Sequence, residues 1–108
     1  MRALRNHGYE VLEAEGPASA EPLVAARGDE IAIVVSDVVM PGASGPELVA
    51  GLRGRLPRAR VLYMSGYTGA AIRRRGLLQE GVPILEKPFT PEVLARKVRE
   101  VLDQHRER

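Results

Sequence analysis

Residues 31–42 constrain the fold more than any other part of the chain. They begin with five apolar residues, Ile-Ala-Ile-Val-Val, most of which are β-branched. Such a run is typical of a strand that is buried on both faces, as in a parallel sheet. Asp37 stands at the end of this strand, shortly before a Met-Pro-Gly turn. Because open α/β sheets bind ligands just beyond the carboxyl ends of their strands, Asp37 is a candidate functional residue.

Asp37 alone allows two interpretations. An aspartate between a strand and a Pro-Gly turn commonly does no more than stabilise the turn. However, withdrawing a carboxylate from water carries a large energetic cost unless the group is paired or binds a cation. The rest of the chain favours a functional role, because a hydroxyl and an ammonium group are expected at the ends of the next two strands.

Segments typical of strands and helices alternate along the chain. We expect strands at residues 9–14, 31–36, 61–64 and 82–85. We expect helices at residues 19–27, from 44 to 53 or 55, at 68–75 and from 91 to about 102, and the last turns of another helix at residues 1–7. This alternation favours right-handed βαβ units. The predicted fold class is therefore α/β, a doubly wound parallel sheet with helices on both faces.

Two of the predicted helices have clear start signals. Ser44 and Glu47 have the spacing of a capping box. Thr90 can serve as the N-cap of the last helix, with Pro91 at its first position. This helix has an apolar stripe with helical spacing, which we expect to pack onto the sheet. The stripe consists of Leu94, Val98, Val101 and Leu102.

Three successive strands are each expected to end in a group suited to phosphate chemistry. Asp37 ends the first of them, Ser65 the second and Lys87 the third. In a parallel sheet these ends lie along one edge, so the three groups can converge. A carboxylate oxygen can attack a phosphoryl group, while the hydroxyl and the ammonium stabilise charge on its oxygens. Gly66 leaves room beside Ser65, and its backbone N–H can point at an anion.

Taken singly, these groups have plainer interpretations. Ser65 followed by Gly66 is typical of a turn, and the sequence Lys-Pro-Phe at residues 87–89 is typical of an entry into a helix. Their order along the chain is what favours a common site.

Composition limits the class of protein. With 108 residues the chain is long enough for one domain with a core of its own. Its 16 basic and 14 acidic residues leave a net charge of +2, which gives no reason to expect a nucleic-acid partner. There is no Cys for a disulfide or a thiolate metal site, and no signal peptide or membrane-length apolar run is visible. We therefore expect a soluble cytoplasmic domain.

Three stretches of the chain match the motifs of one known family. They are Ser-Asp-Val-Val-Met-Pro-Gly at residues 36–42 with Gly45, Met-Ser-Gly-Tyr at residues 64–67, and Glu-Lys-Pro-Phe at residues 86–89. With them, and nearly throughout from Gly8 onward, the chain resembles the receiver domains of bacterial two-component response regulators. Residues 64–68 and the end of the chain look most like the receiver modules of hybrid sensor histidine kinases. The resemblance implies a flavodoxin-like receiver fold, with residues 1–108 forming one signalling domain that is not itself an enzyme.

The resemblance also implies roles for individual residues. Asp37 would accept a phosphoryl group from the phosphohistidine of a histidine kinase or a histidine phosphotransfer domain. Ser65 would be the switch hydroxyl that turns toward the phosphoryl group, and Lys87 would bridge to it, beside a cis Lys87–Pro88 bond. Asp37 and the backbone carbonyl of Val39 would be ligands of Mg²⁺, which prefers oxygen ligands in near-octahedral geometry.

Two features depart from the family pattern. The position three residues before Lys87, where the family usually has an aromatic switch residue, is Ile84. The family's first strand, which ends in the acidic pair that holds Mg²⁺, would precede Met1, so we expect an N-terminally truncated receiver with weak Mg²⁺ binding and poor phosphorylation. Without a strand between residues 9–14 and 31–36, exposed strand edges invite pairing with another chain. We expect a homodimer formed by strand exchange rather than closure of the gap.

Other functions remain as alternatives. A phosphatase of the haloacid-dehalogenase type would need a second Asp at the position of Val39. A flavodoxin-like cofactor binder would need a phosphate loop rich in Ser, Thr and Gly after its first strand. The stronger alternative is a truncated, phosphorylation-incompetent receiver that acts as a protein interaction or dimerisation module.

Overall fold

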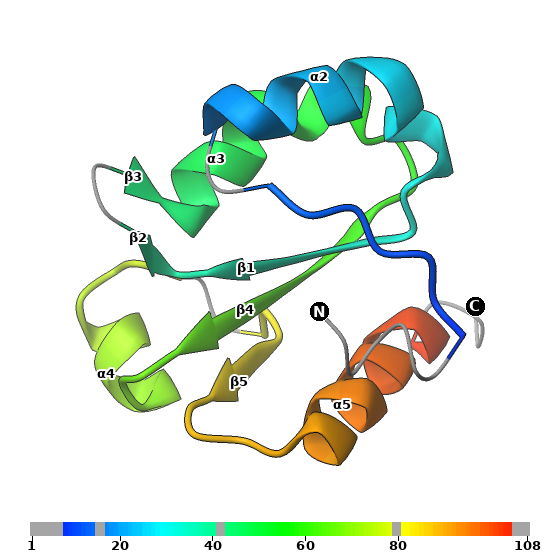
Figure 1. Cartoon of the computed structure of the whole chain (residues 1–108). Helices are drawn as coiled ribbons and strands as arrows, with labels where there is room; N and C mark the ends of the chain where they lie inside the picture. Colours follow the sequence, from blue (N-terminus) through cyan, green and yellow to red (C-terminus); the bar gives the residue numbers. More distant parts are fainter. Residues whose placement is uncertain (1–7, 15–16, 41–42, 79–80, 105–108) are drawn as a thin grey trace.

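A computed structural model of the chain describes residues 8–14, 17–40, 43–78 and 81–104. Its centre is a parallel sheet with the strand order β1-β4-β5 (Figure 1). The three strands are β1 (Ile33–Asp37), β4 (Arg60–Ser65) and β5 (Ile84–Glu86). A short antiparallel pair, β2 (Val39–Met40) and β3 (Ala43–Ser44), follows β1 directly. The predicted α/β class with a parallel sheet is confirmed.

Helices cover both faces of the sheet. On one face lie α2 (Pro17–Arg27), α3 (Gly45–Leu52) and α4 (Gly69–Arg74), and on the other lies α5 (Pro91–Asp103) (Figure 1). Two 3₁₀ turns, η1 (Gly28–Glu30) and η2 (Arg53–Arg55), continue α2 and α3. The alternating strand residues explain this division, because Val34 and Tyr63 face the first group of helices whereas Val35 and Leu62 face α5.

Side-chain caps start three helices, and those predicted at Ser44 and Thr90 are confirmed. The Ser44 hydroxyl accepts a hydrogen bond from the N–H of Glu47 and donates one to the Glu47 carboxylate, at 3.2 and 2.9 Å. Thr68 accepts from the N–H of Ala71 at the start of α4. Thr90 accepts in the same way at α5, where Pro91 occupies the first helical position. Each cap satisfies a backbone donor that a helix start would otherwise leave unpaired.

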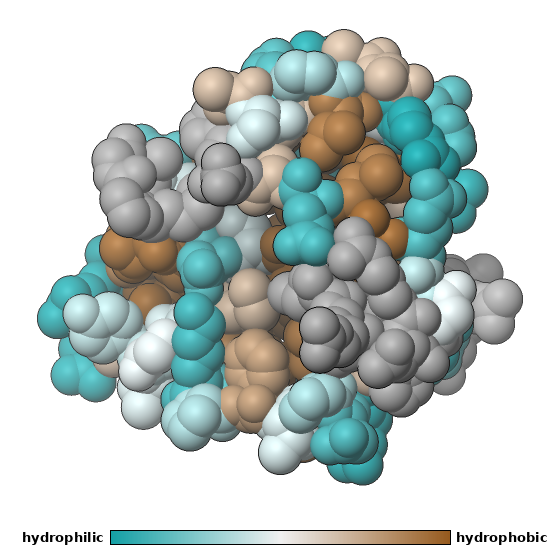
Figure 2. Space-filling view, viewed as in Figure 1, coloured by the Kyte–Doolittle hydropathy of each residue, from teal (hydrophilic) through white to brown (hydrophobic). Residues whose placement is uncertain are grey.

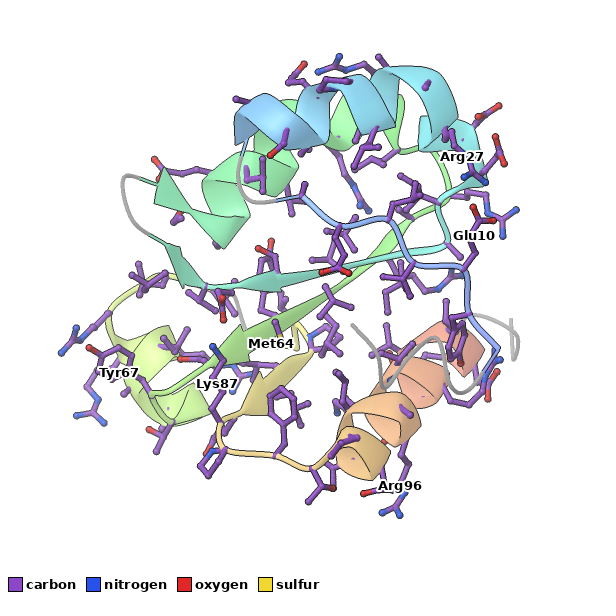
Figure 3. All side chains as sticks on the ribbon, viewed as in Figure 1. Glu10, Arg27, Met64, Tyr67, Lys87 and Arg96 are labelled. Carbon is purple, nitrogen blue, oxygen red and sulfur yellow. The ribbon has the colours of Figure 1, made fainter. Side chains whose placement is uncertain are left out.

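The predicted strand at residues 9–14 is wrong. The structure has an extended segment there that forms no ladder. Tyr9 and Val11 pack against the cluster beneath α5, and the carboxylate of Glu10 pairs with the guanidinium of Arg27 (Figure 3). A strand needs hydrogen bonds to a neighbouring strand, and this segment is paired with none of the described strands. The helix predicted at residues 1–7 and the Pro-Gly turn at 41–42 lie outside the described residues.

One edge of β1 carries no ladder hydrogen bonds. The carbonyl of Ala32 and the N–H of Val38 both form hydrogen bonds to β4, at 3.0 Å each. Because backbone groups alternate in direction along a strand, those of the even-numbered residues between them also point to β4. The backbone groups of Ile33 and Val35 therefore point to the opposite side, where the described residues offer no partner. We call this the open edge of β1. Figure 2 shows apolar surface between α2 and residues 8–14, which run past this part of the sheet.

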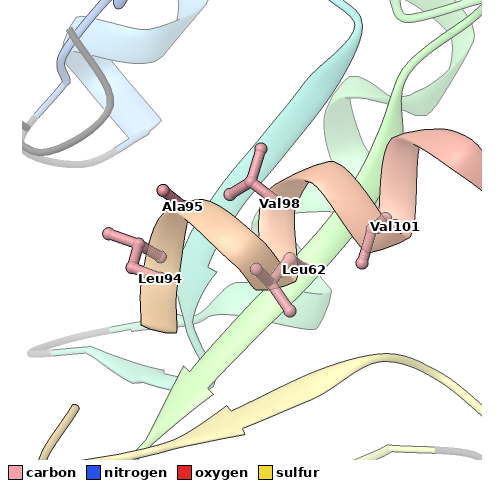
Figure 4. Packing of buried hydrophobic residues seen from close by; sticks show 5 residues of the cluster. All are labelled: Leu62, Leu94, Ala95, Val98 and Val101. Carbon is pink, nitrogen blue, oxygen red and sulfur yellow. The ribbon is translucent and has the colours of Figure 1, made fainter. Parts of the chain in front are cut away.

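The largest described core cluster joins α5 to the sheet (Figure 4). Leu62 of β4 is fully buried, and the α5 residues Leu94, Val98 and Val101 are at most 3% exposed. The predicted stripe is confirmed for these three residues, while Leu102 is only partly buried at the margin of the cluster. None of the described helices is both long and apolar enough to cross a membrane.

Val98→Ala should lower the free energy of unfolding by roughly 1–3 kcal/mol, because it removes two buried methyl groups and leaves a cavity under α5. Urea unfolding followed by circular dichroism measures the change. Val93→Ala is the matched control, since Val93 lies on the same helix and is 37% exposed. It should change stability by no more than about 0.5 kcal/mol. Equal effects of the two substitutions would contradict the packing of α5.

Candidate functional site

The structure brings Asp37 and Lys87 into direct contact at the carboxyl edge of the sheet. Asp37 is the last residue of β1, and Lys87 directly follows β5. Figure 3 shows Lys87 extending from the end of β5 toward β1. Its Nζ lies 2.6 Å from Oδ1 of Asp37, within charge-assisted hydrogen-bond distance. The predicted convergence of these two groups is therefore present.

This ion pair is open to solvent. The side chains of Asp37 and Lys87 are 38% and 45% exposed. Ion pairs with this exposure contribute on the order of 0–1 kcal/mol to the free energy of unfolding, because water and dissolved ions compete for both groups. The contact therefore positions the ammonium without locking it, and the second carboxylate oxygen of Asp37 remains available to a ligand from outside.

Ser65 ends β4, between the other two groups in the sheet. Its carbonyl accepts the N–H of Lys87 at 2.7 Å, and its buried hydroxyl accepts the N–H of Tyr67 at 2.9 Å. No hydrogen bond joins Ser65 to Asp37 within the described part of the chain. The sheet thus places Ser65 at the same edge but with its hydroxyl bound to the following loop. Gly66 lies exposed in that loop, with nothing near the position of a Cβ.

The backbone around Asp37 is fixed by the start of α3. The N–H of Val38 bonds to the carbonyl of Met64, and its own carbonyl accepts the N–H of Gly45 at 2.8 Å. A Cβ at Gly45 would lie only 2.1 Å from the carbonyl oxygen of Asp37. Only glycine permits this approach, which the sequence analysis did not foresee although Gly45 belongs to the matched motif.

Glu86 has a structural role that the sequence analysis missed. Its Oε2 accepts the N–H of Gly69 at 2.8 Å, at the first residue of α4. The contact ties the end of β5 to the start of α4 across 17 residues of sequence. A glutamate just before Lys87 gave no local signal for this, since the partner is a backbone group in another loop.

The described residues do not build a complete Mg²⁺ site. They contain no group of three or more acidic or histidine side chains that could hold a metal ion. Among the described residues, the carboxylate in contact with Lys87 is that of Asp37, and Val39, two residues further on, has a side chain that is 58% exposed. Mg²⁺ commonly binds one or two carboxylates together with waters and phosphate oxygens. The roles predicted for Asp37 and Val39 as metal ligands stay predictions.

Comparison with known proteins identifies the family. Residues 1–99 match the family model of the response regulator receiver domain. The chain belongs to this family. It is 38% identical over 104 residues to the sensor kinase CckA of Brucella abortus, covering 96% of this chain and 11% of that protein. It is also 38% identical over 73 residues to the transcriptional activator protein ExaE of Pseudomonas putida, of which it covers 34%. The chain therefore spans only a minor part of these relatives.

Solved receiver structures share the fold. The receiver domain from the hybrid histidine kinase CckA superposes with a TM-score of 0.75 at 38% identity, covering 94% of this chain and 83% of that one. The chemotaxis protein CheY4 of Vibrio cholerae gives 0.74 at 28% identity, covering 93% and 83%. The predicted resemblance to receivers, and to those of hybrid kinases in particular, is confirmed. The receiver also has the predicted cis bond between Lys87 and Pro88.

The predicted loss of the aromatic switch residue has a structural counterpart in this receiver. Ile84 begins β5 and packs in the cluster with Ile72 of α4. An aliphatic side chain of this size fills the space between β5 and α4. Ring rotation is therefore not a means of signalling at this position.

Gly45→Ala should destabilise the receiver by roughly 1–3 kcal/mol, because the new methyl group overlaps the Asp37 carbonyl and forces α3 away from β1. Gly51→Ala is the matched control on the same helix, where a Cβ would meet nothing within 4 Å. It should stabilise by up to about 1 kcal/mol through helix propensity. Thermal unfolding of both variants measures the difference, and a neutral Gly45→Ala would refute the close approach.

Proposed function

We propose that this receiver accepts a phosphoryl group on Asp37 from the phosphohistidine of a histidine kinase or a histidine phosphotransfer domain. One observation carries the proposal: a carboxylate that is 38% exposed lies 2.6 Å from a lysine ammonium at the carboxyl edge of the sheet. The carboxylate is accessible to a donor, and the cation beside it favours the approach of an anionic phosphoryl group. Membership of the receiver family supports the same role.

The transfer exchanges one bond to phosphorus for another. The free oxygen of Asp37 attacks the phosphorus, the P–N bond to the donor imidazole breaks, and the imidazole takes a proton from solvent. The product is an aspartyl phosphate. The ammonium of Lys87 then shifts from the carboxylate to a phosphoryl oxygen, a small movement because both lie at the same edge. The weakness of the solvent-exposed ion pair makes this exchange inexpensive.

Ser65 and Gly66 would complete the phosphate site. The Ser65 hydroxyl accepts a hydrogen bond from Tyr67, so its own proton is available to donate to a phosphoryl oxygen. Gly66 directly follows Ser65 and lies exposed, so its N–H can approach the same group. These two donors and the Lys87 ammonium would neutralise charge on the phosphoryl oxygens.

Mg²⁺ is the cofactor that the family generally uses for phosphorylation, and we propose that Asp37 and the Val39 carbonyl are this chain's ligands to it. When bound, the ion would offset the charge of the incoming phosphoryl group. Two protein oxygens leave most of an octahedral shell to water and phosphate, so binding should be weak.

Asp37→Asn should abolish phosphorylation of the folded chain by acetyl phosphate, because the amide is not a competent nucleophile. Intact mass spectrometry at high Mg²⁺ should detect one phosphoryl group on the unmodified sequence and none on the variant. Asp29→Asn is the matched control, since Asp29 is exposed in η1, away from the sheet edge. Lys87→Ala should label roughly 10²-fold more slowly.

Two outcomes would refute this assignment. Labelling of Asp37→Asn at the full level would place the acceptor elsewhere. Absence of labelling on the unmodified sequence at any Mg²⁺ concentration would favour the second candidate function, an interaction module that works without phosphorylation.

The open edge of β1 favours that second candidate. Ile33 and Val35 present backbone donors and acceptors without partners among the described residues, flanked by the apolar clusters under α2 and α5. Such an edge is a template for another strand. Residues 9–14 are extended and form no ladder of their own. We propose that the same segment of a second copy pairs there, giving a homodimer by strand exchange.

Size-exclusion chromatography with light scattering tests the dimer. We expect a concentration-dependent dimer, and Ile33→Pro should shift it to monomer, because proline removes an N–H from the open edge and leaves the hydrogen bonds to β4 intact. Ile33→Ala is the control, because it shortens the same side chain but keeps this N–H. A monomer at all concentrations would refute strand exchange.

A further inference from the structure

The amino ends of β4 and β5 border an open depression of about 1020 Å³. Its lining includes Arg60 and Val61, which begin β4, and Val82 and Pro83, which lead into β5. Asp37, Ser65 and Lys87 stand at the opposite, carboxyl ends of the strands. The depression is therefore distinct from the phosphoacceptor edge.

Three arginines line the depression and have no carboxylate partner in the described structure. The Nη1 of Arg53 donates to the carbonyl of Ala59 at 2.9 Å. Arg60 makes one long contact to the carbonyl of Arg58, and its Nε is buried without any acceptor. Arg58 makes no side-chain hydrogen bond within the described residues. By contrast, Arg27, Arg55 and Arg99 each pair with an acidic side chain.

Unpaired arginines that share one depression favour the binding of an anion. Their charges repel one another, and at least one N–H of Arg60 has lost water without gaining an acceptor. The planar guanidinium matches the oxygen spacing of phosphate and carboxylate groups. An anion would thus satisfy both the charge and the missing hydrogen bonds.

Another part of the lining is apolar. Leu77, Leu78, Val82 and Pro83 contribute to it, and all four are only partly buried. The buried Tyr63 also borders the depression, and burial raises the pKa of its hydroxyl while the charge of Arg53 opposes that effect. The hydroxyl is therefore protonated at neutral pH. A ligand that fits this lining combines a negatively charged group with an apolar part.

We propose that this depression binds a phosphorylated small molecule with an apolar part, of the nucleoside diphosphate class. The phosphates would lie against Arg53, Arg58 and Arg60, and the apolar part against the leucines. The volume exceeds that of a single small anion. The chain's own last residues do not complement the arginines in charge, since residues 106–108 read Arg-Glu-Arg. The site is independent of phosphorylation at Asp37.

Fluorescence anisotropy of N-methylanthraniloyl-ADP tests the proposal, and the chain contains no Trp to interfere with the signal. We expect saturable binding that pyrophosphate displaces. Arg58→Glu should weaken it about tenfold or more, because a carboxylate replaces a phosphate partner. Arg58 is exposed and makes no side-chain hydrogen bond in the described residues, so the fold should survive, and circular dichroism checks this.

Arg96→Glu is the matched control, with the same charge change on the outer side of α5, away from the depression (Figure 3). It should alter affinity by less than about twofold. Equal weakening by both variants would show general charge attraction and overturn the proposal, as would failure of pyrophosphate to displace the probe or absence of saturable binding. Asp37→Asn should leave the affinity unchanged, so failure of this site and failure of the phosphoacceptor site are distinguishable.

Discussion

The parallel ladder between β1 and β4 is the constraint on which the rest of the structure depends. It pairs Asp37 with Met64 and thereby fixes how far each strand extends at the carboxyl edge. The next ladder pairs Ser65 with Glu86, which brings Lys87 to the same edge. A shift of one residue in either register would turn the apolar side chains to the wrong faces of the sheet. Core packing on both faces therefore also sets the geometry of the site.

The parts of the fold that sequence predicts well are those with strong local signals. The buried runs at β1 and β4 contain enough β-branched and aliphatic residues to identify them as strands, and Thr90 with Pro91 marks the start of α5. The order of Asp37, Ser65 and Lys87 along successive strands was sufficient to predict a shared edge. Two of these groups are in contact, while the Ser65 hydroxyl is bound to its own loop.

The failures of prediction have a common physical cause, because each depends on a distant backbone. Residues 9–14 have a partly alternating pattern, but a strand requires hydrogen bonds to a neighbouring strand, and this segment passes β1 without pairing with it. Position 45 must be glycine because a Cβ there would overlap the carbonyl of Asp37, eight residues away. The carboxylate of Glu86 accepts a hydrogen bond from the N–H of Gly69. No local pattern in the sequence encodes such contacts. Only the assembled sheet brings the partners together.

The same distant contacts connect the candidate site to α4. Tyr67 donates its N–H to the Ser65 hydroxyl, and Gly69 donates its N–H to Glu86, so the loop before α4 is attached to the ends of both β4 and β5. If the Ser65 hydroxyl donated its proton to a phosphoryl group on Asp37, it could still accept the hydrogen bond from Tyr67 and would couple this loop to the phosphoryl group. Tyr67 is 53% exposed and lies beneath the guanidinium of Arg75, so its loop is not held by core packing. In a receiver with Ile84 in place of an aromatic residue, these two hydrogen bonds connect the carboxyl edge of the sheet to the start of α4.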